Sequence, residues 1–481
     1  MKDKNAVLIW GNQLSIKYNS ALEADKAAPV ILIEAKSACS KYKYHKQKIT
    51  FVLTAMREFA DALKKQGRTV IYRKLDESSE NWYQELLTVC RQHQISELLV
   101  MRQSDKNPQN QLEKWAKQNK ILLQTTENTL FLTRSVDFED WAKQQKQLKM
   151  ETFYRWQRQR LDILMHNGKP LGGQWNYDAE NRKPLPKSMV IPSIAVPKPS
   201  KHRPEVLKLL ETYFRDNPGN NDINWLPVNH DQATQWLEDF IKSRFANFGH
   251  YEDAMQKDEV FLFHSALSPL LNIGLLHPSE VIKTALRADV ELDSKEGFIR
   301  QIIGWREFMF GLYHYYPSSW KESNYFNNKL GLQKEWWTLD SDKFNEIPLK
   351  HVIARLNDYG YSHHIERLMV LGNYMLLSEY NPRDVYEWFM SMYVDAYEWV
   401  MVPNVIGMSQ YADGGIDNKG FATKPYISGA NYLQKMGKWW TAEELATTKW
   451  TYLYWKFLSK HKQKLSTNYR LLPLLNKKLK K

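Results

Sequence analysis

The sequence predicts an N-terminal α/β domain with an open parallel sheet, followed by a large all-α C-terminal domain. Two observations lead to this fold class. Short apolar runs alternate with helical patterns over residues 6–130, and helical spacing dominates from residue 205 to about residue 460. The expected domains are residues 1–135, an interdomain region of helices and linker at 136–204, and the helical domain at 205–481.

Five buried apolar runs in the first domain have the character of parallel strands. They lie at residues 6–10, 30–34, 69–73, 98–102 and 121–125, with helical patterns at 46–66 and 80–93 between them. The segment lacks a GxGxxG and a GxxxxGK[ST] motif, so neither a standard dinucleotide fold nor a phosphate loop is indicated.

Residues 181–204 contain six prolines, six lysines or arginines and no acidic residue. Helix and central strand are both disfavoured there, which predicts an extended basic linker across the surface. Composition leaves open whether it is a tether or a contact. Beyond it, Ser279 is the expected N-cap of a helix at 279–288, and Asn381-Pro382 is expected to open another. The basic segment at 456–481 is either a phosphate-facing arm or a solvated tail.

The bulk properties narrow the class of partner. Lysine and arginine exceed the acidic residues by 67 − 54 = 13, which favours a polyanionic partner. The only cysteines, Cys39 and Cys90, cannot form a disulfide framework. No signal peptide and no uninterrupted run of 18 apolar residues is seen, so we expect a cytoplasmic protein with no membrane span. We also expect a monomer.

Two sequence blocks carry candidate binding chemistry. In residues 263–268, Ser265 and Ser268 are expected on one helical face near a helix start, where hydroxyl and N–H groups bind phosphate or simply cap the helix. Residues 296–308 fit an amphipathic helix on which Gln301 and Trp305 share a face. Arg306 and Glu307, which follow Trp305, can form a structural ion pair.

Two further blocks carry titratable groups. His363 and His364 are adjacent, and adjacent side chains diverge by about 100° on a helix, which argues against a shared metal. A histidine proton donor beside a cavity is the sharper interpretation. Asp395 lies among aromatic residues and needs a partner if it is buried; Arg367 is a candidate.

These four blocks, in this order, resemble the photolyase/cryptochrome superfamily. The resemblance is closest to its prokaryotic branch, which includes bacterial (6-4) photolyases and iron–sulfur bacterial cryptochromes. It extends over nearly the whole chain through three more runs, at residues 11–15, 172–184 and 422–426.

The resemblance implies a U-shaped FAD inside the helical domain. Arg367 and Asp395 correspond to the ion pair against the flavin ring, and Met401 falls where an acid or amide often faces flavin N5. The remaining implied contacts are Tyr251, His264, Ser265 and Ser268 for the pyrophosphate and ribose, and Gln301, Trp305 and Arg306 for the wall beside the flavin.

The resemblance also implies the substrate, UV-damaged DNA. His363 and His364 match the paired histidines of the (6-4) lesion pocket, with Leu368 and Tyr426 as neighbours. The implied reaction is light-driven electron transfer from reduced FAD, with histidine-assisted proton transfer. Arg182, followed by Lys183, resembles an interdomain arginine that reaches toward the DNA, which makes the linker a contact rather than a tether.

The chain differs from the branch at positions of the electron-transfer path and of the metal cluster. Trp388 and Trp337 match tryptophans of its electron-transfer path, but Phe389 replaces a tyrosine and cannot act as a tyrosyl relay. The branch carries a [4Fe–4S] cluster on four cysteines. The matching positions here are Pro348, Trp440, Glu443 and Thr448. We therefore expect no iron–sulfur cluster and no metal site.

The antenna and the lesion type remain open at the level of sequence. Glu34 matches an acidic residue of the branch's lumazine pocket, whereas Asn12 replaces the usual aspartate, which leaves the antenna's identity uncertain. A (6-4) photolyase is the favoured function. A cryptochrome-like photoreceptor is the alternative that Met401, Phe389 and the missing cysteines support. Cyclobutane-dimer repair is weaker, because simple ring splitting does not need the histidine pair.

Overall fold

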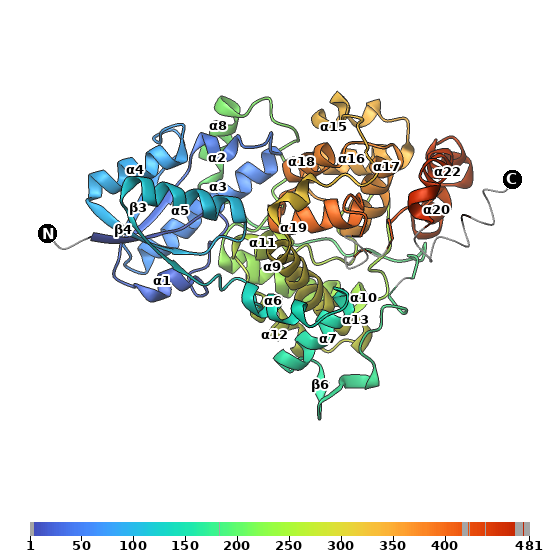
Figure 1. Cartoon of the computed structure of the whole chain (residues 1–481), viewed down its shortest axis with the longest axis horizontal. Helices are drawn as coiled ribbons and strands as arrows, with labels where there is room; N and C mark the ends of the chain where they lie inside the picture. The colour runs from blue at the N-terminus through green and yellow to red at the C-terminus, as the bar shows by residue number, and fades with distance from the viewer. Residues whose placement is uncertain are drawn as a thin grey trace.

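The computed structural model describes residues 4–181, 183–415, 422, 424–437, 439–466 and 475. The N-terminal part is a five-stranded sheet with the order β3-β2-β1-β4-β5, in which every neighbouring pair is parallel (Figure 1). Its strands are β1 (Lys4–Leu8), β2 (Val30–Ile33), β3 (Val70–Arg73), β4 (Ile95–Met101) and β5 (Leu122–Thr126). The predicted open parallel sheet is confirmed, with each strand within a few residues of the expected run.

Helices cover both faces of this sheet, which explains why its strands are apolar throughout. Val7, Val30 and Leu32 pack into a core shared with α3 (Lys46–Lys65). Leu8 and Ile31 pack into a second core shared with α4 (Trp82–His93) and α5 (Lys106–Asn119). The helices of this part are α1 (Ser20–Ala24), α2 (Lys36–Cys39), α3 (Lys46–Lys65), α4 (Trp82–His93) and α5 (Lys106–Asn119).

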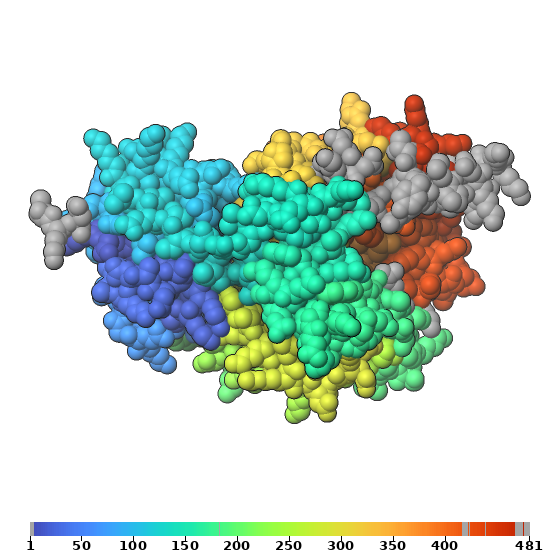
Figure 2. All heavy atoms as spheres, turned by 60° about the horizontal axis from the view of Figure 1, so that its bottom comes forward, coloured from blue at the N-terminus to red at the C-terminus, as the bar shows by residue number. Residues whose placement is uncertain are grey.

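The interdomain region connects the two parts. It contains α6 (Ser135–Lys143), α7 (Met150–Leu161) and the short antiparallel hairpin of β6 (Met165–His166) and β7 (Lys169–Pro170), followed by a 3-10 turn at Leu171–Gly173. Figure 2 shows this region lying against the helical domain. Residues 183–200 form no helix or strand, and the hydroxyl of Ser200 donates to Glu58 of α3 at 2.6 Å.

The rest of the described chain is mainly helical, as predicted. Its α-helices are α8 (Arg203–Tyr213), α9 (His230–Ser243), α10 (Phe245–Phe248), α11 (Ser268–Ile273), α12 (Pro278–Arg287), α13 (Leu292–Ile299), α14 (Glu307–Tyr315), α15 (Lys334–Thr338), α16 (Ile347–Tyr359), α17 (Asn373–Leu377), α18 (Pro382–Met392), α19 (Glu398–Met401), α20 (Ala430–Gly437), α21 (Ala442–Ala446), α22 (Trp450–Lys460) and α23 (Lys462–Leu465). Short 3-10 turns lie at Ser318–Glu322 and Ser341–Lys343. No helix within the described ranges has both the length and the apolar character that a membrane crossing requires.

Three π-helical segments interrupt this domain: η2 (Arg300–Arg306), η5 (Glu366–Gly372) and η6 (Val402–Ser409). Within the described residues, η2 lies in the 296–308 block, η5 begins two residues after His364, and η6 follows the segment that carries Asp395. The expected regular helix over 296–308 is therefore wrong in its middle. π segments widen a helix by one residue and recur at functional sites, because they redirect the side chains that follow.

Helix starts give one confirmation and one correction. Asn381 caps α18, and its side chain accepts from the Arg383 N–H at 3.0 Å, as predicted. The expected cap at Ser279 is wrong, because α12 begins one residue earlier at Pro278. His277 is the N-cap, and its Nδ1 accepts from the Ser279 N–H at 3.2 Å. Sequence preference for serine at this position did not anticipate an imidazole acceptor.

Candidate functional site

A buried ion pair lies at the centre of the helical domain. Arg367 donates through Nη1 to Oδ1 of Asp395 at 2.9 Å and through Nη2 to Oδ2 at 3.0 Å. Asp395 is 5% exposed, and its Oδ2 also accepts from the hydroxyl of Ser268 at 2.6 Å. The partnership expected between Arg367 and Asp395 is therefore present, and Ser268 joins it from another helix.

Several elements hold this pair in place. Arg367 lies on η5, where its Nε donates to the carbonyl of Ser362 at 2.7 Å and its guanidinium lies 4.1 Å from the ring centre of Tyr393. Asp395 lies between α18 and α19, and its carbonyl accepts from Asn272 of α11 at 2.8 Å. Burial alone raises the pKa of Asp395, but the charge and hydrogen bonds of Arg367 outweigh it and hold that pKa below its ordinary value. The carboxylate is therefore ionised.

Two stacked histidines adjoin the ion pair. The rings of His264 and His363 lie 4.5 Å apart at an interplanar angle of 14°. Burial lowers the pKa of His264 to about 3, with the nearby His364 as a second cause, and burial lowers the pKa of His363 well below its ordinary value. Both imidazoles are therefore neutral. Nε2 of His264 and both ring nitrogens of His363 are buried without a hydrogen-bond partner among the described residues. Unpaired buried nitrogens of this kind fit a polar ligand.

Glu366 lies next to the buried histidine. One of its oxygens pairs with Arg355, and the same oxygen is 3.6 Å from Nε2 of His363, too far for a hydrogen bond. Its other oxygen has no hydrogen-bond partner in the described part of the chain. Burial raises the pKa of Glu366 to about 7, although Arg355 opposes this shift. Near neutral pH, this carboxyl can therefore hold or release a proton beside His363.

His364 differs from its neighbour because its side chain is exposed, whereas His363 is buried. The difference follows from the backbone, since His363 precedes the helical turn and His364 begins it. Leu368, one turn further, is buried, and Tyr426 is half-buried. Of the two histidines, His364 is the one that a group arriving from outside can meet first.

The phosphate-binding candidates are arranged differently from the prediction. Ser265 lies in the loop before α11, and Ser268 is the first residue of that helix. The expectation that the two hydroxyls share one helical face is wrong, because Ala266 between them has a left-handed φ of 51° and turns the chain. The carbonyl of Ser265 accepts from Trp236 at 2.8 Å. Tyr251 lies nearby, with its ring 5.5 Å from that of Phe263.

The residues expected along the flavin wall do not share one set of neighbours. Gln301 of η2 donates to Glu252, whose pKa burial raises to about 8 even though Arg300 opposes that shift. Trp305 is partly exposed. Arg306 instead donates to Glu307 at 2.9 Å and lies 4.1 Å from the ring centre of Phe131. Its contacts are those of the structural ion pair that the sequence also allowed, and its position beside a flavin stays a prediction.

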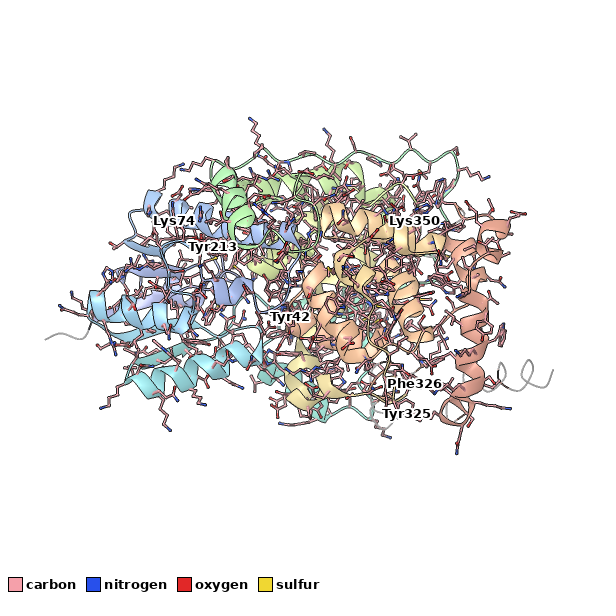
Figure 3. The ribbon with its side chains drawn as sticks, turned by 90° about the horizontal axis from the view of Figure 1, so that it is seen from above. Tyr42, Lys74, Tyr213, Tyr325, Phe326 and Lys350 are labelled. Carbon is pink, nitrogen blue, oxygen red and sulfur yellow. The ribbon has the colours of Figure 1, made fainter. Side chains whose placement is uncertain are left out.

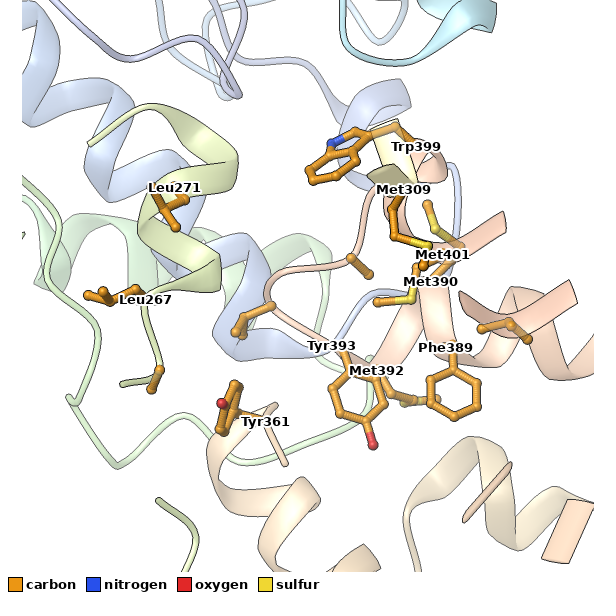
Figure 4. Packing of buried hydrophobic residues seen from close by; sticks show 14 of the residues in the cluster. Leu267, Leu271, Met309, Tyr361, Phe389, Met390, Met392, Tyr393, Trp399 and Met401 are labelled. Carbon is orange, nitrogen blue, oxygen red and sulfur yellow. The ribbon is translucent and has the colours of Figure 1, made fainter. Parts of the chain in front are cut away.

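Met401 is buried in a methionine-rich part of the core. Figure 4 shows it close to Met309 and Met390, below Trp399. The thioether offers only a weak acceptor to any ring atom that it meets. A residue that usually carries an acid or an amide in the related branch is here part of the apolar packing.

Trp388, one of the two residues expected to carry electrons, belongs to a connected group of aromatic rings. Trp388 is fully buried, and its ring lies 5.6 Å from that of Trp336 and 5.1 Å from that of Phe389. Phe389 stacks on Tyr393 at 5.4 Å, and Tyr393 lies under the guanidinium of Arg367. Trp337, the second predicted relay, is only half-buried and follows Trp336 on α15.

Sequence reasoning missed Trp336 and Tyr393. The signal was available, because Tyr393 precedes Asp395 by two residues and Trp336 directly precedes a predicted relay. The resemblance implies roles for Trp388 and Trp337 at the matching positions, and it implies nothing for the neighbouring Trp336 and Tyr393.

The positions that match the cluster cysteines hold other chemistry. Trp440 is 1% exposed, and its Nε1 donates to Nδ1 of His351 at 3.1 Å. Pro348 is buried in the first turn of α16, Glu443 is exposed, and the hydroxyl of Thr448 donates to the carbonyl of Leu445 at 2.7 Å. No three His, Cys, Asp or Glu side chains in the described ranges are arranged to hold a metal ion.

In the α/β domain, Glu34 is already paired within the protein. It accepts from Arg57 at 2.7 and 2.9 Å, from the Tyr72 hydroxyl at 2.6 Å and from the Leu75 N–H at 3.0 Å. Asn12 is half-buried just beyond β1. The DNA-contact candidates are only partly described: Lys183 is exposed and donates its N–H to the carbonyl of His250 at 3.0 Å, whereas Arg182, Thr423 and most of the basic tail lie outside the described residues.

Residues 7–225 match the family of deoxyribodipyrimidine photo-lyase-related proteins. A (6-4) photolyase of Agrobacterium fabrum is 36% identical over 480 residues, covering 97% of this chain and 93% of that protein. Among solved structures, a bacterial class III photolyase from Agrobacterium tumefaciens aligns with a TM-score of 0.60 at 16% identity, covering 96% of this chain and 92% of that one. A cryptochrome from Synechocystis aligns with a TM-score of 0.58 at 14% identity, covering 96% and 94%.

Proposed function

This chain belongs to the photolyase/cryptochrome superfamily, and from that premise we propose that it is a DNA photolyase that repairs (6-4) pyrimidine photoproducts under blue light. The observation that carries the proposal is the group of buried, unpaired imidazole nitrogens on His264 and His363 beside the Arg367–Asp395 pair. A protein without a polar ligand at this point would leave those nitrogens unsatisfied.

Members of this superfamily bind FAD, and the residues around the ion pair fit it. Asp395 offers an ionised acceptor to a ring N–H, and Arg367 offers a fixed positive charge. Ser268 and His264 supply a hydroxyl and a buried imidazole for the more polar parts of the molecule. When bound, reduced FAD excited by light supplies the electron that opens the lesion.

The protein's own contribution is to hold charge and exclude water. Asp395 is held by Arg367, Ser268 and Asn272, so its carboxylate does not need to reorient when a ligand binds. The aromatic rings of Tyr361 and Tyr393 lie 5.1 and 4.1 Å from the Arg367 guanidinium and shield it from solvent. A charged site kept dry in this way has a stronger electrostatic effect than the same groups in water.

Proton transfer is divided between two histidines. The side chain of His364 is exposed, so it is placed to give its ring N–H proton to a lesion that enters from outside. Desolvation of its ring, with the charge of Arg367 as a second cause, lowers its pKa to about 4, so this imidazole is neutral near pH 7 before a lesion binds. His363 is buried and neutral, and Glu366 beside it titrates near neutral pH. This pair can hold the proton that the repaired base must give back.

The DNA partner is supported by charge and by the fate of the lesion. The formal net charge of +13 favours a polyanion. A damaged base leaves the stack at lower cost than an intact one, which favours its entry into a pocket. We place Lys183 and Arg182 at the DNA, and Leu368 and Tyr426 next to the lesion. We further expect a monomer without an iron–sulfur cluster. A lumazine-type antenna would have to share Glu34 with Arg57 and Tyr72.

A cryptochrome-like photoreceptor is the second candidate. Met401 and Phe389 favour it, since they replace groups that tune or relay electrons in the related branch. Cyclobutane-dimer repair is the third, and the buried histidine stack argues against it, because ring splitting alone needs no proton donor.

A repair assay distinguishes the three. Purified protein with its flavin reduced beforehand is illuminated with blue light in the presence of oligonucleotides that carry either lesion. Restoration of the (6-4) lesion alone supports the proposal. Turnover of only the cyclobutane dimer, or flavin photoreduction with neither lesion repaired, identifies one of the alternatives.

A further inference from the structure

A lysine of the α/β domain reaches into the helical domain close to Asp395. Lys48 lies in the first turn of α3 and is 7% exposed. Its Nζ donates to the carbonyl of Met390 at 3.2 Å and to the carbonyl of Ala396 at 2.7 Å. These two carbonyls bound the segment 390–396, which runs from the last turn of α18 into the loop before α19 and carries Asp395. One ammonium group thus ties together both ends of that segment, as the closeness of α3 to α18 and α19 in Figure 1 allows.

Lys48 also satisfies the end of α18. Met390 lies in the last turn of this helix, which has no basic residue of its own in that turn. The N–H of Val394, four residues on, donates to the carbonyl of Gly360 at 3.0 Å and does not continue the helix. Carbonyls at a helix C-terminus lack intrahelical partners and carry partial negative charge. Lys48, from the other domain, therefore donates a hydrogen bond to a carbonyl at the C-terminus of α18 and places a positive charge there. A basic residue in the last turn of a helix often has this role.

The ammonium group of Lys48 is buried among aromatic rings, where a positive charge is costly in free energy. Its Nζ lies 4.6 Å from the ring centre of Tyr44 and 5.3 Å from that of Tyr397. Burial lowers the pKa of Lys48 to about 7, with Asp395 and Asp105 opposing the shift and Lys41 adding to it. An apolar side chain would fill this space without such a cost, so packing alone does not explain a lysine here.

The neighbouring segment strengthens the same connection between the domains. The N–H of His45 donates to the carbonyl of Ser391 at 2.8 Å, and Nε2 of His45 lies 3.1 Å from the carbonyl of Asn357. Figure 3 shows Tyr42, from the same stretch, between the two domains. The turn that precedes α3 is therefore docked on the helical domain, and Lys48 lies directly after it, buried in the first turn of α3.

We infer that Lys48 is a positioning residue for the flavin site, which fixes the segment carrying Asp395 and adds a second positive charge, after Arg367, to the surroundings of that carboxylate. The inference rests on the proposed function, because it takes the flavin to lie against Asp395. It follows that the α/β domain influences how readily the bound flavin is reduced. A positive charge near a group that gains negative charge on reduction makes that reduction more favourable.

The test compares the wild-type holoprotein with Lys48→Met, Lys48→Arg and the matched control Lys64→Met, which makes the same change at an exposed position of the same helix. Two quantities are measured in the dark: the midpoint potential of the bound flavin and the hydrogen exchange of residues 390–398. We expect Lys48→Met to shift the potential to more negative values and to exchange faster over 390–398. At about pH 6, where Lys48 is protonated, Lys48→Arg should retain the wild-type potential. Lys64→Met should match wild type in both quantities.

An unchanged potential in Lys48→Met with FAD bound overturns the inference and leaves the proposed function intact. If wild type binds no FAD, the proposed function fails and the effect of Lys48 on the flavin fails with it. Exchange then tests only the claim that Lys48 fixes residues 390–398: faster exchange in Lys48→Met supports that claim, and equal exchange refutes it. If Lys48→Met does not fold, wild type and Lys48→Arg are compared from about pH 6 to about pH 9. The wild-type potential should fall more steeply as Lys48 loses its proton, and identical profiles would overturn the inference.

Discussion

The imidazole of His363 stacks on that of His264 at a centroid distance of 4.5 Å, and three of their four ring nitrogens have no hydrogen-bond partner among the described residues. The stack joins the loop before α11 to the start of η5, two segments about a hundred residues apart in the chain. Buried nitrogens in this state fit a polar ligand, and under the proposed function that ligand is the flavin or the lesion.

Replacing the exposed histidine should separate chemistry from cofactor binding. We expect His364→Ala to lower the repair rate of a (6-4) lesion by about 100-fold or more, because positioned proton transfer contributes at least that much. FAD content should stay at the wild-type level, since His364 lies outside the buried stack. The measurement is single-turnover repair under blue light with reduced flavin. Wild-type repair by His364→Ala would contradict its role as proton donor.

The buried ion pair should dominate the stability of the site. Arg367→Met leaves Asp395 as an unpaired buried charge, and we expect it to lower the free energy of unfolding by about 3–5 kcal/mol. The matched control is Arg383→Met, whose partners Glu387 and Glu322 lie on the surface at 3.2 Å, and its loss should cost less than about 1 kcal/mol. Urea titration of both variants gives the comparison. Equal losses would mean that the Arg367–Asp395 pair has no special weight.

The sequence predicts those features of the structure that depend on residues close together in the chain or on the chemistry of a single residue. The five strands are continuous apolar runs, and such runs are dictated by burial on both faces of the sheet. The Arg367–Asp395 partnership was also foreseen, because a carboxylate among aromatic residues needs a cation. Both inferences use chemistry that each residue carries with it.

Other features could not be predicted from the neighbouring sequence, because they depend on contacts between distant segments or on an unusual backbone conformation. Nothing in residues 44–48 indicates that Lys48 would bond to the carbonyls of Met390 and Ala396. The π segments were missed because their i→i+5 bonds leave no signature in hydrophobic spacing. Ser265 was placed on a helix because the left-handed backbone at Ala266 is unusual for alanine.

The domain interface should make stability depend on pH. Burial and the charge of Glu398 raise the pKa of Asp105 to about 6, and Asp105 accepts from the Trp399 N–H at 2.9 Å. Between about pH 4 and pH 6 the folded protein holds a proton that the unfolded chain has released, so stability falls as pH rises through this window. We expect Asp105→Asn to remove this loss and to stabilise the protein by on the order of 1–2 kcal/mol at pH 7.

Unfolding titrations at several pH values test this expectation. Asn retains an acceptor oxygen for the Trp399 N–H, so the variant changes charge and little else. Asp76→Asn, at an exposed position of the same domain, is the matched control and should keep the wild-type profile. A wild-type profile in Asp105→Asn would mean that Asp105 does not account for the pH dependence.

The aromatic group should carry electrons through Trp388 and Trp336. Their rings are 5.6 Å apart, and Nε1 of Trp388 donates to the carbonyl of Trp336 at 2.7 Å. We expect Trp388→Phe and Trp336→Phe each to slow photoreduction of the flavin by about tenfold or more, because phenylalanine is not a redox relay. Time-resolved absorbance under blue light measures the rate. Trp115→Phe, in the α/β domain, is the control, and a larger effect of Trp337→Phe than of Trp336→Phe would restore the relay first predicted.

The space that a cluster would occupy in the related branch should instead contribute packing energy. The Trp440 ring is buried against Gly437, where an added Cβ would come within 2.5 Å of it. Trp440→Ala removes a large buried side chain and should cost about 3–5 kcal/mol, and Gly437→Ala should destabilise by overpacking the same contact. Urea unfolding measures both, with Tyr452→Ala, an exposed aromatic on α22, as the control. Iron analysis of the purified protein accompanies it. Bound iron, or a Trp440→Ala loss no larger than that of the control, would contradict the view that apolar packing has replaced a metal centre here.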